Sequence, residues 1–192
     1  MVVQLLVVPG STRTGAFSKS LAAAVPALLP AEVKAKVVDL RDHAMPLYDQ
    51  DLEEASGLPE GALSLRQEVL LCDAVLFVSP EYNSSIPAVL KNAIDWLSRP
   101  HAPEPDVRTW AGKVAGLLAS SPGALGGLRG LVHLRQILMN VGMQVVTEQF
   151  ALGGAHQAFD ESGQLAEERA AAGVQKVLNS VARMAKALQG AG

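Results

Sequence analysis

The segment VVPGSTRTGAFSKSL, residues 7–21, gives the clearest indication of the fold class of this chain. An apolar run stops at Pro9-Gly10, and a short stretch rich in hydroxyl groups then leads into an amphipathic segment. Apolar runs alternate with longer amphipathic segments along the rest of the chain, which is the pattern of βαβ units and a parallel sheet. We therefore interpret this segment as the first strand-to-helix connection of an α/β protein.

Five short apolar runs have the composition of buried strands, and amphipathic segments separate or follow them. The predicted strands are VQLLVV (3–8), KAKVVDL (34–40), AVLFVS (74–79), KVAGLLAS (113–120) and QVVTEQF (144–150). The predicted helices cover residues 18–29, 60–71, 85–98, 125–141 and 166–188, and the long loops are 41–61 and 99–110. Pro26 should kink the first helix. Without a repeat or a linker, residues 1–192 are expected to form a single domain around a three-layer, doubly wound, five-stranded parallel sheet.

Composition and charge exclude several classes of protein. Hydrophobic residues make up 49% of the chain and aromatic residues 4%, which is typical of a globular protein with an Ala, Val and Leu core. The formal net charge of -3 argues against nucleic acid as the main partner, because binding to the phosphate backbone needs a basic surface. The first apolar run is too short to span a membrane, and a lone Cys72 is unlike a secreted domain. We expect a cytoplasmic protein.

The first candidate loop suits a phosphate group. A doubly wound sheet binds ligands outside the carboxyl ends of its strands, which points to the loops after strands one, three and four. In the first of these loops, Ser11, Arg13 and Ser18 offer hydrogen-bond donors beside the N-terminus of a helix. The alternative interpretation is a polar turn in which Ser18 is only the N-cap of the helix.

Two nucleotide-binding motifs almost match this loop. Gly10 and Gly15 fit a P-loop, but Ala16-Phe17 stand where its lysine and its hydroxyl residue are needed. Thr12 replaces a glycine of the dinucleotide fingerprint. The loop is therefore better suited to a phosphate monoester than to a triphosphate or a dinucleotide.

The segment SPEYNSSIPAVLKNAIDWLSR, residues 79–99, follows the third predicted strand. A planar ring could lie at this sheet edge, against Pro80, Glu81, Tyr82 and Asn83. The alternative is a polar turn with a packed tyrosine. Ser84 or Ser85 is expected to cap the helix, whose second apolar row includes Trp96 and indicates either a subunit interface or a broad intramolecular face.

The segment ASSPGALGGLRGLVHLRQIL, residues 119–138, supplies the third loop through Ser120, Ser121 and Gly123. It resembles a relaxed nucleophile elbow, so a serine hydrolase is a further alternative. Pro122 argues against that reading, because the residue after the serine must donate a backbone N–H to the oxyanion. The base would have to be His156 with Glu148 as its acid.

No metal site is predicted. The four histidines are far apart, and none forms a ligand pattern with another histidine or with Cys72. Cys72 is interpreted as a small buried hydrophobic residue.

Together these loops resemble the NADPH-dependent FMN reductase family of flavodoxin-like enzymes, which includes chromate, quinone and azo-dye reductases. Four segments carry the resemblance, in the family's order: GSTRTGAFSKSLA, PLYDQDLE, SPEYNSSIPAVLKNAIDWLSR and SSPGALGGLRGLVHLRQILMNVGMQVV. The resemblance extends from the first predicted strand to at least the fifth. The combination of the four segments is far more specific for this family than any one loop.

The resemblance implies that FMN is the cofactor and that NADPH or NADH is the hydride donor. It implies phosphate binding by Ser11, Arg13 and Ser18. It also implies a segment beside the flavin ring at Pro80, Glu81, Tyr82 and Asn83, and a loop along the other ring edge at Ser120, Ser121 and Gly123. The implied assembly is a homodimer or a homotetramer.

The implied activity is hydride transfer from the nicotinamide through the flavin to a quinone, an azo dye, a metal oxyanion or free flavin. No catalytic side chain is needed beyond those that position the reactants. The sequence departs from the family at Ala16, where a serine often faces the phosphate, so we expect FMN to be exchangeable. An electron carrier or FMN-binding protein without turnover is the alternative, although carriers usually have a strongly acidic surface.

Overall fold

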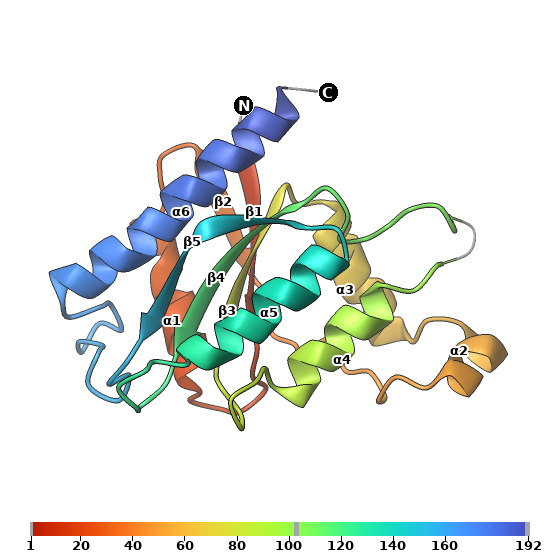
Figure 1. Cartoon of the computed structure of the whole chain (residues 1–192), viewed down its shortest axis with the longest axis horizontal. Helices are drawn as coiled ribbons and strands as arrows, with labels where there is room; N and C mark the ends of the chain where they lie inside the picture. The colour runs from red at the N-terminus through yellow and green to blue at the C-terminus, as the bar shows by residue number, and fades with distance from the viewer. Residues whose placement is uncertain (1, 102–103, 191–192) are drawn as a thin grey trace.

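Five parallel strands form one sheet in the order β2-β1-β3-β4-β5 (Figure 1). The strands are β1 (Val3–Pro9), β2 (Val33–Val37), β3 (Ala74–Ser79), β4 (Val114–Ser120) and β5 (Gln144–Leu152). This is the flavodoxin-like order, in which the direction of winding reverses between β1 and β3. The predicted fold class is confirmed.

The structure is a computed structural model that describes residues 2–101 and 104–190. Parts of the predicted single domain (residue 1, residues 102–103 and residues 191–192) and of the predicted 99–110 loop therefore lie outside the described residues. None of the helices in the described ranges combines the length and apolarity needed to cross a bilayer.

Helices cover both faces of the sheet. The helical elements are α1 (Phe17–Ala24), η1 (Val25–Leu28), α2 (Gln50–Ser56), α3 (Glu60–Leu70), α4 (Ala88–Leu97), α5 (Leu128–Asn140) and α6 (Glu168–Gln189). Apolar side chains of α3, α4 and α5 share one core with the sheet, and those of α1 and α6 share the other. The result is three layers (Figure 1).

The strand sequences explain why the sheet is covered on both faces. Along β3, Val75 and Phe77 belong to the core under α3, α4 and α5, whereas Leu76 and Val78 belong to the core under α1 and α6. Since successive side chains point to opposite faces, a strand covered on both sides must be apolar throughout. Every residue of β3 and β4 is buried.

The first predicted helix is too long at its C-terminal end. Instead of a kinked helix over 18–29, α1 ends at Ala24 and a short 3-10 helix follows, with Pro26 in its first turn. Proline has no N–H for the next α-helical hydrogen bond, so the chain changes its geometry there. The suggestion that Ser18 caps this helix is wrong, because the N-cap is Ala16 and no side chain accepts a capping bond.

Two helices begin three residues later than predicted. The N-cap of α4 is Pro87, so neither Ser84 nor Ser85 caps it. The N-cap of α5 is Gly127, whose φ of 91° is left-handed. In both cases a turn with backbone in the left-handed region precedes the helix and delays its start.

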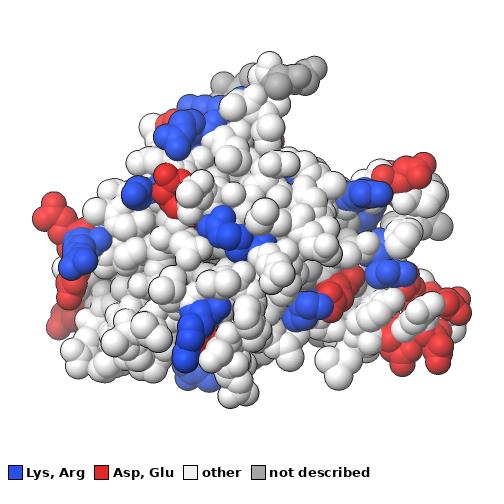
Figure 2. All heavy atoms as spheres, in the orientation of Figure 1, with Lys and Arg blue, Asp and Glu red and all other residues white. Residues whose placement is uncertain are grey.

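The predicted loop 41–61 contains α2, which the sequence did not indicate. This seven-residue helix buries no residue, and its local signals lie at its ends. The carboxylate of the N-cap Asp49 accepts from the amides of Asp51 and Leu52, and Gly57 is the C-cap. Figure 2 shows acidic side chains gathered over α2.

The indole of Trp96 in α4 is fully buried and donates to the carbonyl of Pro46. The second apolar row of α4 therefore packs within the chain at Trp96.

Candidate active site

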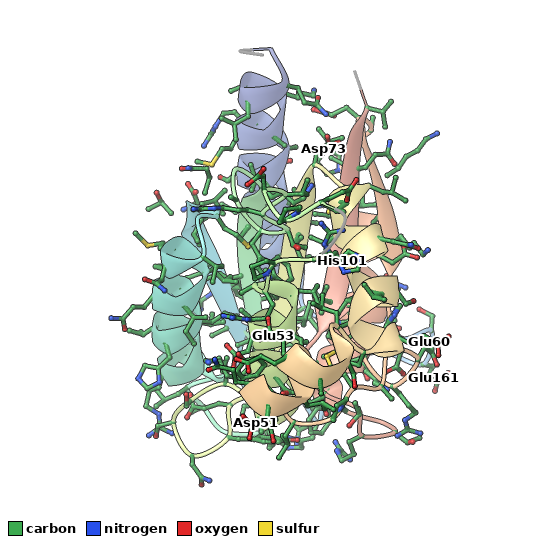
Figure 3. The ribbon with its side chains drawn as sticks, turned by 90° about the vertical axis from the view of Figure 1, so that its right-hand side faces the viewer. Asp51, Glu53, Glu60, Asp73, His101 and Glu161 are labelled. Atoms are coloured by element: carbon green, nitrogen blue, oxygen red, sulfur yellow. The ribbon has the colours of Figure 1, made fainter. Side chains whose placement is uncertain are left out.

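The loops after β1, β3 and β4 meet at the carboxyl edge of the sheet, which is the lower edge in Figures 1 and 3. Asp73, which precedes β3, marks the opposite edge at the top of Figure 3. The three loops line a pocket of about 200 Å³. The predicted site residues that line this pocket are Ser11, Arg13, Ser18, Pro80, Glu81, Tyr82, Ser120 and Ser121. We call this space the loop pocket.

Two predicted site residues, Asn83 and Gly123, lie in the same loops but do not line the loop pocket. Three further residues line it as well, namely Ala16, Phe17 and Pro122, of which the family resemblance had placed only Ala16 near the phosphate. A larger cavity of about 730 Å³ lies around Trp110 and Gly142, at the other edge of the sheet, and contains no predicted site residue. Because position at the carboxyl edge matters more than size, the loop pocket is the candidate active site.

The β1 loop is folded back on itself at its arginine. The Arg13 amide donates to Ser11 Oγ at 3.2 Å, and one guanidinium nitrogen of Arg13 donates to the Gly15 carbonyl at 3.0 Å. Gly15 has a φ of 67°, which favours glycine. Arg13 also lines the pocket beside the first turn of α1, an arrangement suited to an anion.

Two serine hydroxyls in the pocket wall are buried without hydrogen-bond partners. Ser18 Oγ at the start of α1 and Ser120 Oγ at the end of β4 have no partner among the described residues. Serine residues that are 1% and 2% exposed normally satisfy their hydroxyls within the protein. A ligand with polar groups in the loop pocket would satisfy them, so the residues present fit a phosphorylated cofactor such as FMN.

A tight turn presents Tyr82 at the mouth of the loop pocket. The Tyr82 amide donates to the Ser85 carbonyl at 2.9 Å, and the Ser85 amide donates to Tyr82 at 3.0 Å. Between them, Asn83 and Ser84 have φ values of 49° and 64°, as in a type I′ turn. The alternative of a packed tyrosine is wrong, because Tyr82 is 50% exposed.

Glu81 connects two walls of the loop pocket. Its carboxylate accepts from Arg129 Nε at 2.8 Å and from the Gly130 amide at 3.1 Å, in the first turn of α5. Burial acts to raise the pKa of Glu81, but the hydrogen bonds and charge of Arg129 and the Gly130 amide outweigh it, and the pKa is lowered. Glu81 is therefore held as a carboxylate that joins the β3–α4 loop to α5. Sequence spacing gave no sign of this pairing.

The geometry gives no support to a serine hydrolase. Ser121 Oγ accepts from the Gly123 amide at 3.3 Å, and in the described chain no hydrogen bond joins Ser121 to His156. A hydrogen bond with Ser180 of α6 lowers the pKa of Glu148. Glu148 therefore interacts with α6 and does not serve as the acid of a Ser-His-Glu triad. Within the described ranges no cluster of three His, Cys, Asp or Glu residues could hold a metal ion.

Fold and pocket together define a flavodoxin-like α/β protein whose loop pocket lies at the switch point of the sheet and suits a phosphorylated ligand. The model of the NADPH-dependent FMN reductase family matches residues 3–157, and the chain belongs to this family. It is an NAD(P)H-dependent flavin oxidoreductase that uses FMN.

Individual relatives agree with this assignment. A quinone reductase of Pseudomonas putida is 40% identical over 165 residues, which is 85% of each chain. An NAD(P)H-dependent FMN reductase of Pseudomonas aeruginosa is 33% identical over 98% of each chain. The flavoenzyme NAD(P)H:(acceptor) oxidoreductase FerB from Paracoccus denitrificans has a similar structure, with a TM-score of 0.83 and 28% identity over 97% of this chain and 98% of that chain.

Proposed function

We propose that this protein is an NAD(P)H:quinone reductase, with a homodimer or homotetramer as its working form and the cytoplasm as its compartment. The net reaction converts NAD(P)H, a proton and a quinone into NAD(P)⁺ and a hydroquinone. Bound FMN supplies reversible two-electron chemistry, which accepts hydride from the nicotinamide and passes the electrons on. The observation that carries the proposal is the loop pocket, in which two buried hydroxyls without partners lie close to the β1 loop with Ser11 and Arg13. The 40% identity to a quinone reductase supports the choice of acceptor.

Each loop has its own part in holding FMN under this proposal. Ser11, Arg13 and Ser18 bind the phosphate together with the first amides of α1. The segment Pro80, Glu81, Tyr82 and Asn83 lies beside the flavin ring, and Ser120, Ser121 and Gly123 lie along its other edge. Because these groups only bind, orient and exclude water, catalysis here depends on positioning.

The acceptor is identified by comparing substrates on one preparation. The FMN-loaded protein is mixed with NADPH and, in separate assays, a benzoquinone, an azo dye, chromate or excess FMN. We expect kcat/KM to be at least tenfold higher for the quinone than for the other acceptors. Equal values would leave the quinone assignment unsupported, and no nicotinamide oxidation above the free-flavin background would indicate a carrier without turnover.

A row of exposed apolar side chains on α5 supports the oligomeric part of the proposal. Leu128, Val132 and Met139 are 42%, 59% and 60% exposed, and Leu125 just before the helix is 56% exposed. In Figure 2 much of the surface over α5 is uncharged. Burying such a row against a second copy would remove apolar area from water. Val132→Glu should therefore lower the mass seen by light scattering, whereas an unchanged mass would place the interface elsewhere.

A further inference from the structure

A second pocket lies on the other side of the β1 loop. It has a volume of about 320 Å³, and residues of the β1 loop, of the segment after β2 and of α4 line it, among them Thr12, Arg41, His43, Met45, Val89 and Asn92. Thr12 stands between Ser11 and Arg13, which both line the loop pocket. One stretch of backbone therefore separates the two pockets.

One side of this second pocket can bind an anion. Arg41 donates from one guanidinium nitrogen to the Thr12 carbonyl, which fixes the orientation of its planar group at the rim. Its other guanidinium donors form no hydrogen bond or ion pair among the described residues. His43 Nδ1 is buried and likewise has no partner in the described chain. Two residues with nitrogen groups that can donate hydrogen bonds thus line the same pocket, and these groups have no acceptor among the described residues.

The other side of the pocket is apolar and fits a flat heterocycle. Leu40, Met45, Val89 and Ala93 line it. The volume falls at the lower end of the range of about 300–1,000 Å³ found for small-molecule sites, which suits a mononucleotide. A phosphate edge beside an apolar wall is the arrangement expected for an adenosine phosphate.

The pocket wall formed by residues 39–48 is held in place at both ends. At one end, Asp39 accepts from the Arg41 amide at 3.0 Å and from Lys19 Nζ of α1 at 2.5 Å. At the other end, Asn92 of α4 accepts from the Tyr48 amide at 2.8 Å and donates to the Pro46 carbonyl at 2.8 Å. A site held in this way loses little conformational entropy when a ligand binds.

We propose that the second pocket binds the adenosine 2′-phosphate end of NADPH, and that Arg41 and His43 select NADPH over NADH. The inference rests on the proposed NAD(P)H-dependent function. A guanidinium matches a phosphate dianion with paired charged hydrogen bonds, whereas the 2′-hydroxyl of NADH gives it no charge to bind. Because only the β1 loop separates the pockets, the nicotinamide half of the same molecule can extend toward the flavin.

The direct test measures binding to the FMN-loaded protein by calorimetry, with adenosine 2′,5′-bisphosphate and AMP as probes. The test variant is Arg41→Gln, which removes the guanidinium and its charge but keeps a polar side chain. The matched control is Arg108→Gln, an exposed arginine that precedes β4 at the opposite edge of the sheet. We expect Arg41→Gln to weaken bisphosphate binding by about tenfold and to leave AMP binding unchanged, as loss of one charged hydrogen bond predicts.

Steady-state kinetics give the second measurement. Arg41→Gln should raise the KM for NADPH by about tenfold and leave the KM for NADH and the flavin content unchanged. If Arg41→Gln releases FMN, the same measurements are made on His43→Ala, because the His43 imidazole makes no hydrogen bond to the β1 loop in the described chain. Equal bisphosphate affinities in wild type and both variants would overturn the inference, as would a changed KM for the quinone alone. A protein that binds the bisphosphate through Arg41 but oxidises no nicotinamide would contradict the proposed function and not this pocket.

Discussion

Glu81 of the β3–α4 loop and Arg129 of α5 form an ion pair in which the Glu81 side chain is 8% exposed and the Arg129 side chain is 60% exposed. The same carboxylate accepts from the Gly130 amide, one of the N–H groups that a helix leaves free in its first turn. The pair therefore joins the β3–α4 loop of the candidate active site to the first turn of α5. It links two elements that are far apart in sequence.

Removing the charge of Glu81 should destabilise the protein in a pH-dependent way. We expect Glu81→Gln to lower the free energy of unfolding by about 2 kcal/mol at pH 7, because charged hydrogen bonds are lost. The pKa of Glu81 is lowered in the folded state, so its contribution is present above the unfolded value of about 4.3 and is lost as the pH falls through the folded value. Urea unfolding at pH 7 and below pH 4 should show the difference between the two proteins shrinking in acid. A difference that is the same at both pH values would show that this charge is not its source.

Removing the unpaired hydroxyls of Ser18 and Ser120 should have different effects on the stability of the protein and on its affinity for FMN. Ser18→Ala and Ser120→Ala remove buried hydroxyls without partners, so the FMN-free protein should keep or slightly gain stability. The same changes should weaken FMN binding by about two- to tenfold each, as loss of one hydrogen bond predicts. Ser79→Ala is the matched control, because Ser79 is equally buried and its Oγ donates to the Pro80 carbonyl at 2.8 Å. That variant should lose stability and bind FMN normally. A destabilised apo Ser18→Ala would show that its hydroxyl already has a partner.

Arg13 should be needed for holding FMN and dispensable for folding. It is exposed, and within the part of the chain that the structure describes its one side-chain hydrogen bond goes to a carbonyl of its own loop. Loss of a charged contact with phosphate predicts that Arg13→Ala weakens FMN binding by about tenfold or more, with an unchanged melting temperature of the apo protein. Flavin retained through gel filtration, compared with Arg108→Ala, measures the effect. Equal retention in the two variants would remove Arg13 from the site.

The strands could be predicted because a parallel sheet covered on both sides requires continuous apolar runs. The run 74–79 matches β3 at both ends, and the carboxyl-edge rule then places the loops that contain Ser11, Tyr82 and Ser120 at one pocket. This reasoning needs only local composition and strand order. Both are properties that a single sequence carries.

Features that depend on pairing between distant residues were not predictable in this way. Glu81 and Arg129 are 48 positions apart, and neither stands out in its own segment. Helix α2 buries no residue and so leaves no apolar period, and Trp96 has the same periodicity whether a partner or its own chain covers it. Tertiary contacts, which the local pattern does not specify, decide each of these cases.

Gly126 should be intolerant of any side chain because two effects combine there. Its φ is +62°, and a Cβ would lie 2.7 Å from backbone atoms of Ala151, Leu152 and Gly153. Gly163 is a matched control, since its φ is +78° but a Cβ there would have open space. Gly163→Ala should cost about 1–2 kcal/mol from backbone strain alone. Gly126→Ala should cost clearly more in urea unfolding and reduce FMN binding, because the turn into α5 must move. Equal costs would mean that the neighbouring backbone yields freely.

Cys72 should react slowly in the folded protein although it is a simple thiol. It is 8% exposed, and its Sγ donates to the Val69 carbonyl. Burial is the main cause that raises the pKa of Cys72 to about 11. Near pH 8 only about one thiol in a thousand is then the reactive thiolate, compared with about a quarter for an ordinary cysteine. Because the folded state favours the protonated thiol, this contribution to stability is present below about pH 8.5 and is lost as the pH rises toward the folded value. Mass spectrometry after iodoacetamide treatment should show little labelling at pH 8 and complete labelling in 8 M urea. Rapid labelling of the folded protein, with its melting temperature unchanged, would show that the thiol is open to solvent.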